Sequence, residues 1–227
     1  MSRFLKISST VMMLIMMGET AIAQMSDFTV SGNISGISDY RFRGVSLTSK
    51  DPAVQGTLNL QHSSGFYVTV WGSNISDFNG ANTEVDVMAG YVFDAGNDVS
   101  FNLGVMEYIY PGGTGTNYFE AYGFATFPVA VGSLTVGINY TPSQNNIGSQ
   151  DNTYLSASYS MPILDTGLTG SAYFAYEDGA FGTNKTDWSL GLSYDIDQIT
   201  IGAKYIDTNL GSGAGSATGL GYITLNF

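Results

Sequence analysis

The sequence contains no cysteine, one histidine and only seven lysine and arginine residues, against nineteen aspartate and glutamate residues. Without cysteine, the chain has no disulfide bonds, no thiolate metal ligands and no lipoprotein anchor. The formal net charge of −12 argues against nucleic-acid binding, because that function needs a basic surface. After the amino-terminal segment, no stretch approaches the about twenty apolar residues of a transmembrane helix.

The first residues have the composition of a secretory signal peptide. Arg3 and Lys6 precede an apolar run from Val11 to Met17, and the small-residue pattern Ala21–Ala23 follows. The apolar run is too short to cross a bilayer as a helix. We expect cleavage after Ala23, which divides the chain into a signal peptide, residues 1–23, and one exported domain, residues 24–227.

Alternation of side-chain type dominates the exported domain. In residues 187–196, apolar side chains alternate with Asp, Ser or Gly, and residues 84–93, 134–140 and 155–161 follow the same period of two. This is the period of a β-strand with one apolar and one polar face. Abundant glycine and aromatic residues fit strands that meet lipid on one face and a polar interior on the other.

The alternating segments predict an all-β fold, a transmembrane antiparallel β-barrel of about twelve strands. Each segment has about the length needed to cross a bilayer at a tilt, and no connection is long enough for a helical crossover. Ten or fourteen strands, or an exported β-sandwich, remain as alternatives. The expected strands are residues 27–45, 53–62, 66–75, 83–94, 98–110, 117–128, 132–142, 151–163, 167–178, 186–197, 199–210 and 218–227.

The expected connections alternate in length. Short turns on one side and long loops on the other are typical of outer-membrane barrels, with the short side and both termini facing the periplasm. Aromatic girdles are also expected, with Tyr40 and Phe42 toward lipid at the outer end of the first strand. The longer connections lie near residues 47–52, 76–82, 111–116, 143–150, 179–185 and 211–217, and the short ones near 63–65, 95–97, 129–131, 164–166 and 197–198.

The end of the chain supports the same interpretation. Residues 222–227 alternate and finish with the aromatic residue Phe227. This ending resembles the terminal strand signal by which bacterial outer-membrane proteins are recognised for assembly. We therefore expect Phe227 to be an assembly signal read by the barrel-assembly machinery.

Several motifs are those of a known family. They are Ser38–Ser46 (SDYRFRGVS), Pro52–Gly56 (PAVQG), Trp71–Asn74 (WGSN) and Tyr110–Gly112 (YPG). With these motifs the chain resembles the TorF-like porin family, which is also known as an uncharacterised bacterial domain family of the Gcw_chp type. The resemblance spans nearly the whole exported domain, although its distinctive motifs lie in the first half. It implies an outer-membrane location and a pore, and it supplies no catalytic residues.

Charged residues are expected inside the barrel. Alternation in the first strand places its two arginines opposite Tyr40 and Phe42, and unpaired guanidinium groups cannot readily face hydrocarbon. The charges form either a constriction that sets ion preference or a salt-bridge network that fills and rigidifies a narrow barrel, with Arg41 or Arg43 pairing to a carboxylate. The candidate set is Asp39, Arg41, Arg43, Glu84, Asp86, Glu120, Asp187, Asp195 and Lys204.

The sequence lacks the residue combinations on which catalysis usually depends. Hydrolytic barrels need a histidine or comparable base beside a nucleophile or an activated water. The one histidine, His62, precedes Ser63 and Ser64 in an expected turn, which favours a solvated turn residue. The sequence has no phosphate loop, metal-ligand spacing or nucleotide motif, so we expect no enzyme activity, no metal and no cofactor.

The sequence favours passive diffusion of small hydrophilic solutes or ions through a narrow pore. Acidic lumen residues outnumber basic ones, which predicts a weak preference for cations. A closed structural or adhesion barrel with partner-binding outer loops is the first alternative, and an enzymatic barrel is the second. The expected partners are outer-membrane lipid, the barrel-assembly machinery and small solutes or ions, and no nucleic acid. The solute and the oligomeric state do not follow from the sequence.

Overall fold

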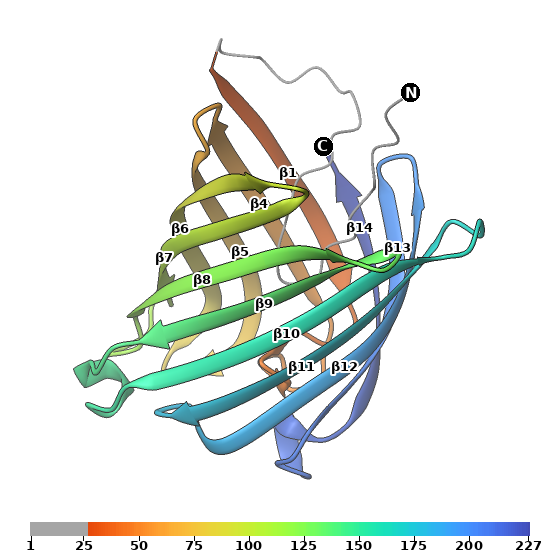
Figure 1. Cartoon of the computed structure of the whole chain (residues 1–227). Coiled ribbons are helices and arrows are strands. Elements are labelled where there is room, and N and C mark those ends of the chain that lie inside the picture. Colours follow the sequence, from red (N-terminus) through yellow and green to blue (C-terminus); the bar gives the residue numbers. More distant parts are fainter. Residues whose placement is uncertain (1–26) are drawn as a thin grey trace.

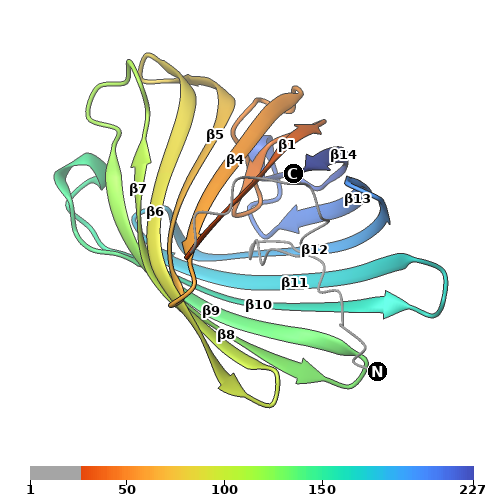
Figure 2. The ribbon, with the colours of Figure 1, turned by 90° about the horizontal axis from the view of Figure 1, so that it is seen from above.

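The computed structural model describes residues 27–227, so the expected signal peptide lies outside the described residues. Within this range, twelve strands form a closed barrel in the order β1-β14-β13-β12-β11-β10-β9-β8-β7-β6-β5-β4 (Figures 1 and 2). β1 (Phe28–Ile37) pairs antiparallel with both β4 (Ala53–His62) and β14 (Thr218–Asn226), which closes the sheet. The predicted fold class and strand number are confirmed. No helix in residues 27–227 is long and apolar enough to span a membrane.

The twelve strands of the wall range from 9 residues in β14 to 16 residues in β6. Two further short strands and two 3₁₀ turns lie in the connections. The other wall strands are β5 (Phe66–Phe78), β6 (Ala81–Gly96), β7 (Val99–Ile109), β8 (Tyr118–Val129), β9 (Gly132–Thr141), β10 (Asn152–Ile163), β11 (Leu168–Gly179), β12 (Gly182–Ile196) and β13 (Ile199–Thr208). The connections contain β2 (Arg41–Phe42), β3 (Val45–Ser46), η1 (Asn145–Ile147) and η2 (Gly213–Gly215).

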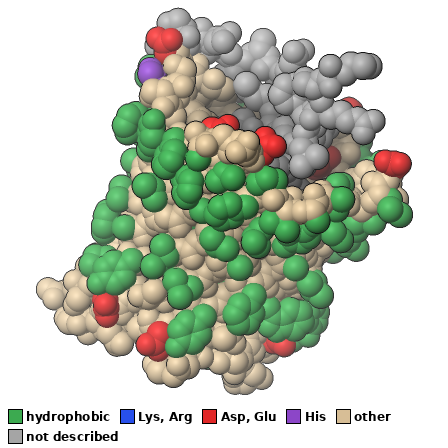
Figure 3. All heavy atoms as spheres, viewed as in Figure 1, with side chains coloured by type: hydrophobic (Ala, Val, Ile, Leu, Met, Phe, Trp, Pro, Cys, Tyr) green, Lys and Arg blue, Asp and Glu red, His purple; other side chains and the backbone are tan. Residues whose placement is uncertain are grey.

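The outer face of the wall is apolar. Leu58, Leu103 and Phe174, on three different strands, are 53–54 % exposed. Their sequence neighbours Thr57, Asn59 and Asn102 are buried, because successive strand residues point to opposite faces. Figure 3 shows hydrophobic side chains spread over the wall, with acidic side chains toward its ends. An apolar band around a closed barrel is what contact with lipid requires.

The short connections occur where the sequence predicts them. The turn between β6 and β7, for example, consists of Asn97 and Asp98, both with positive φ (55° and 60°). Two positive φ values give the turn type that matches the twist of a hairpin. The carboxy-terminal end of β14 lies on the side of the barrel opposite to η1 and η2 (Figure 1).

Two of the six predicted longer loops are wrong. The segments near residues 76–82 and 179–185 are two-residue turns, Asn79–Gly80 and Ala180–Phe181. The neighbouring strands extend farther than expected, because turn-forming residues such as Asn and Gly in these segments also occupy strand ends. As a result Lys185 is a residue of β12, buried at 2 % exposure, and not part of an outer loop.

The prediction of one continuous strand over residues 27–45 is wrong beyond Ile37. From there the chain turns into the barrel, forms the β2–β3 hairpin and returns to the wall at Ala53. We call residues 38–52 the inserted hairpin. Tyr40 packs on Trp71 with ring centroids 5.3 Å apart, and Phe42 packs on Tyr108 at 5.6 Å. Tyr40 and Phe42 therefore contact side chains of the lumen and not lipid.

Candidate functional site

The tip of the inserted hairpin is a two-residue turn. Arg43 has a φ of 49° and Gly44 a φ of 81°, and the flanking residues Phe42 and Val45 are paired. A Cβ atom at Gly44 would overlap side-chain atoms of Thr208 on β13 and Asp187 on β12. Glycine is therefore needed both for the backbone conformation and for the close approach to the wall.

Gly44→Ala should lower the free energy of unfolding by about 1–2 kcal/mol from the left-handed backbone alone, and further through the overlap with the wall. Gly96→Ala is the matched control, because Gly96 has a φ of 86° but no atom within 4 Å of its ideal Cβ position. Urea unfolding of the refolded barrel measures both changes. Equal losses in the two variants would contradict the close packing of the hairpin tip.

Arg43 joins two carboxylates on different strands of the wall. Its Nη1 donates to Glu177 Oε1 on β11 at 2.7 Å, and its Nη2 donates to Glu120 Oε2 on β8 at 2.5 Å. The guanidinium carbon lies 4.4 Å from the ring centroid of Tyr154 on β10. Both carboxylates are at most 1 % exposed. The tip of the hairpin is thus fixed by two buried ion pairs and a cation–π contact.

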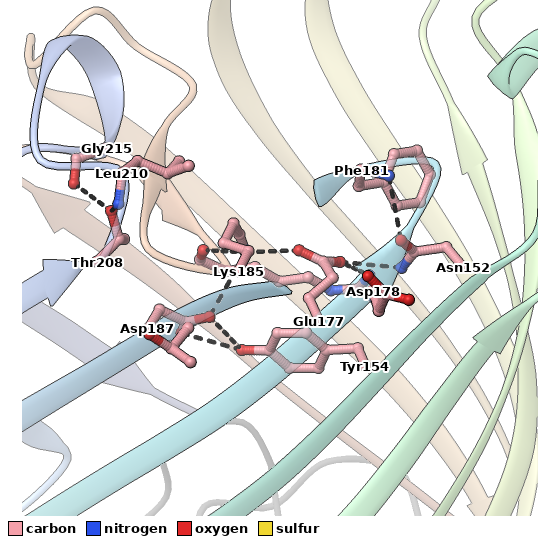
Figure 4. A network of polar contacts seen from close by, with 12 residues as sticks. Asn152, Tyr154, Glu177, Asp178, Phe181, Lys185, Asp187, Thr208, Leu210 and Gly215 are labelled. Atoms are coloured by element: carbon pink, nitrogen blue, oxygen red, sulfur yellow. Dashed lines mark hydrogen bonds and ion pairs between the residues drawn. The ribbon is translucent and has the colours of Figure 1, made fainter. Parts of the chain in front are cut away.

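A second cation extends this network along β12, as Figure 4 shows. Lys185 Nζ lies 2.5 Å from Glu177 Oε2 and 3.5 Å from Asp187 Oδ2, and it donates to the carbonyl of Arg43 at 2.8 Å. The Tyr154 hydroxyl donates to both oxygens of Asp187, at 3.0 and 3.1 Å. Lys185 therefore connects the wall to the backbone of the hairpin tip.

Among the described residues, Glu84 of β6 has two phenol donors and no cation as partners. Tyr40 of the inserted hairpin donates to Oε2 at 2.9 Å, and Tyr110, which follows β7, donates to Oε1 at 2.8 Å. Burial raises the pKa of the Tyr40 phenol, and the negative charge of Glu84 raises it further, so the hydroxyl stays protonated and acts as the donor. The hydrogen bond from Tyr40 to Glu84 holds the start of the inserted hairpin against the wall, and the ion pairs of Arg43 hold its tip.

Asp86, two residues along β6, differs from the other inward carboxylates. It is 7 % exposed, and its Oδ1 is buried without a hydrogen-bond partner among the described residues. Its strand neighbours are Trp71 on β5 and Tyr108 on β7, neither of which carries a charge. Asp86 therefore places in the lumen a carboxyl group that no described cation contacts.

Two further charges of the hairpin, Arg41 and Asp39, are paired with each other. Arg41 Nε donates to Asp39 Oδ2 at 2.7 Å, and Ser46 Oγ donates to Asp39 Oδ1 at 2.6 Å. Arg41 Nη1 also donates to the carbonyls of Gly44 and of Ser216, the latter in the loop between β13 and β14. These contacts shape the hairpin and tie it to the neighbouring loop.

The structure brings seven of the nine predicted lumen residues to the inserted hairpin or to the wall around it, and leaves two apart. Asp195 lies exposed at the far end of β12, where it accepts a hydrogen bond from Thr200. Lys204 is half-buried on β13, with its Nζ 5.5 Å from the ring centroid of Tyr222. The sequence prediction missed Glu177 and Lys185. The alternation Tyr173, Ala175, Glu177 on one face of β11 was the signal for Glu177.

The inward face away from the hairpin is largely uncharged. The Tyr67 hydroxyl lies 2.9 Å from Asn102 Oδ1 and 2.5 Å from the Tyr122 hydroxyl, and Thr69 donates to Asn59 at 2.6 Å. These residues come from β4, β5, β7 and β8. Hydroxyl and amide groups of this kind give a polar lining without a strong field of either sign.

His62 lies in the short turn after β4. Its Nδ1 is 2.7 Å from Ser64 Oγ, and its ring packs edge-on against Phe28 at 4.8 Å. The pair is exposed, and Ser64 N also donates to Nδ1 at 3.1 Å, so the contact belongs to the turn. Within residues 27–227, no three His, Cys, Asp or Glu side chains are grouped so that they could hold a metal ion.

Comparison with known proteins places the chain in a family. The model of a family of bacterial proteins of unknown function, Gcw_chp, matches residues 21–222. The chain belongs to this family. The match confirms the family resemblance found in the sequence motifs. No curated protein matches the sequence significantly.

Solved structures share the fold of this Gcw_chp protein. The KdgM porin, solved in complex with disordered oligogalacturonate, has 12 % sequence identity and a TM-score of 0.60, covering 88 % of this chain and 99 % of the porin. The NanC porin has 13 % identity and a TM-score of 0.58, covering 86 % and 98 % of the two chains. The barrel architecture is therefore that of small porins.

Proposed function

We propose that the protein is a narrow outer-membrane channel for passive diffusion of small hydrophilic solutes or ions, with a weak preference for cations. The observation that carries this proposal is the division of the closed wall into an apolar outer face and a polar lumen. The fold shared with the KdgM and NanC porins supports it. The inserted hairpin occupies part of the lumen, which favours small solutes.

The expected ion preference follows from the charges near the hairpin. Five wall carboxylates face two cations, while Arg41 and Asp39 neutralise one another. A ring with excess negative charge raises the local concentration of cations in a pore. The five carboxylates are Glu84, Asp86, Glu120, Glu177 and Asp187, and the two cations are Arg43 and Lys185.

Single-channel recording under a salt gradient should give discrete current steps and a reversal potential of the sign expected for cation preference. Asp86→Asn should reduce that preference, because it removes an acidic lumen group that no described cation contacts. Asp178→Asn is the matched control, since Asp178 neighbours Glu177 on β11 but is exposed outside the lumen. Anion-selective currents from the wild-type barrel would contradict the proposed preference.

A closed structural or adhesion barrel is the second candidate, and the inserted hairpin favours it by filling part of the lumen. Deletion of the loop over residues 209–217 would then abolish attachment to a partner and leave permeability unchanged. We propose no enzymatic role, because His62 and Ser64 form an exposed turn with no third group beside them among the described residues. Loss of a hydrolase activity in His62→Ala would overturn that view.

A further inference from the structure

The two carboxylates that contact Arg43 also accept hydrogen bonds from residues of the wall. Glu120 accepts hydrogen bonds from Tyr108, Asn139 and Thr141, at 3.1, 2.8 and 2.8 Å. Glu177 accepts one from Asn152 at 2.9 Å and is paired with Lys185. All of these donors are wall residues. The two carboxylates are therefore held in position by the barrel and present their free lone pairs to the lumen.

The geometry of this position matches a guanidinium group. Two nitrogens of the planar Arg43 guanidinium donate hydrogen bonds to the carboxylates on β8 and β11. The face of the guanidinium lies over the Tyr154 ring on β10. The rings of Phe42 and Phe181 lie 4.7 and 5.9 Å from the same guanidinium carbon. Carboxylates around the edge and aromatic rings on the face are the contacts that bind guanidinium more tightly than a compact ammonium or sodium ion.

Arg43, which lies between Glu120 and Glu177, is not part of the wall. Arg43 lies at the tip of the inserted hairpin, and the wall strands on either side of that hairpin end at Ile37 and begin again at Ala53. Without Arg43, the five wall carboxylates would face Lys185 alone. A cation at this site stabilises Glu120 and Glu177, because buried charged carboxylates without a partner are unfavourable.

We propose that Glu120, Glu177 and Tyr154 form a binding site for guanidinium-type organic cations, which the chain's own Arg43 occupies in this structure. Small solutes that carry a guanidinium group compete with the hairpin tip for this site. The solute class rests on the proposed channel function, since such a solute reaches the site through the lumen. The binding site itself does not depend on conduction.

Chemical rescue tests the site without a current measurement. Arg43→Ala is refolded in detergent, and its thermal unfolding is followed with methylguanidinium chloride or with NaCl at equal ionic strength. Methylguanidinium should raise the unfolding temperature by roughly 3–6 °C more than NaCl at a concentration about ten times its Kd. The wild-type barrel should show no such difference, because Arg43 fills its site. Urea at the same concentration controls for the shape of the probe without its charge.

A second variant fixes the location of the effect. Arg43→Ala/Glu120→Gln removes one of the two carboxylates and keeps a group of similar shape, so it should lose at least half of the methylguanidinium shift. A folded Arg43→Ala barrel that responds equally to methylguanidinium and NaCl would overturn the proposal. An equal response of the single and double variants would overturn it as well.

Refolding gives an independent measurement if Arg43→Ala folds poorly. Arg43→Met, which keeps an apolar stem without the charge, is refolded beside it with and without methylguanidinium, and the folded fraction is read from migration of unheated samples on a detergent gel. A higher folded fraction with methylguanidinium supports the site, and equal fractions count against it. A rescued barrel that carries no current would support the binding site and contradict the proposed channel function. A conducting barrel that methylguanidinium does not rescue would support the channel function and contradict the binding site.

Discussion

A barrel in which a tight turn replaces the inserted hairpin should conduct several-fold more current per channel than the wild-type barrel. The hairpin buries Asp39, Tyr40 and Thr48 inside the wall, so its removal leaves lumen that side chains now fill. Ile37 and Ala53 are register partners in the β1–β4 pairing, so an Asn-Gly turn can join them without displacing either strand. Planar-bilayer recording of both barrels measures the difference.

The loop between β9 and β10 provides the matched control. Thr141 and Asn152 are also register partners, so residues 142–151 can be replaced by the same turn. Most of that loop is exposed, and we expect the single-channel conductance to stay close to that of the wild-type barrel. A barrel without the inserted hairpin that migrates as folded protein but keeps wild-type conductance would show that the hairpin does not restrict the pore.

The barrel could be predicted from the sequence because lipid and lumen impose different side chains on alternating positions. The β12 segment illustrates this, since Leu190 and Leu192 are 55 % and 51 % exposed while Ser193 is buried. A short connection near residues 95–97 was also predicted, and the structure has the turn at Asn97–Asp98. Both features depend on neighbours within a few residues, and a single sequence contains that information.

The inserted hairpin could not be predicted in the same way. Alternation over Asp39 to Arg43 separates a charged face from an aromatic face, but it does not say what each face contacts. Tyr40 and Phe42 would suit lipid as well as they suit the tyrosines of the lumen. Their position depends on Glu84 and Tyr108, which are more than forty residues away along the chain. The pairing of Arg43 with a carboxylate was among the sequence hypotheses, whereas its partner Glu177 was not.

The tight turn at Ala180–Phe181 explains why Lys185 was missed in the sequence. Residues 179–185 were expected to form an outer loop, so Lys185 was not assigned to either face of a strand. Lys185 and Asp187 are two residues apart and therefore share a face of β12. Once the strand is extended to Gly182, both side chains point to the lumen. Small errors in strand ends therefore have large consequences for a site built at the ends of strands.

Arg43→Ala should lower the free energy of unfolding by about 3–5 kcal/mol, because it leaves two buried carboxylates without a partner. Glu120 and Glu177 are at most 1 % exposed and cannot turn toward water without leaving their other hydrogen bonds. Lys50→Ala is the control, since Lys50 is an exposed cation of the same hairpin, and its loss should change stability by no more than about 0.5 kcal/mol. Urea unfolding of refolded barrels measures both values.

The origin of that loss can be separated from the loss of packing by a double-variant cycle. Arg43→Met/Glu120→Gln removes the cation together with one of its carboxylates and keeps side chains of similar length. If uncompensated charge causes the destabilisation, the double variant should be more stable than Arg43→Met alone, because Lys185 still neutralises Glu177. Strictly additive losses would instead mean that Arg43 acts through packing on Tyr154 and Phe42. The coupling energy is the difference between the stability change of the double variant and the sum of the two single-variant changes. Its sign decides whether charge or packing holds the hairpin in the lumen.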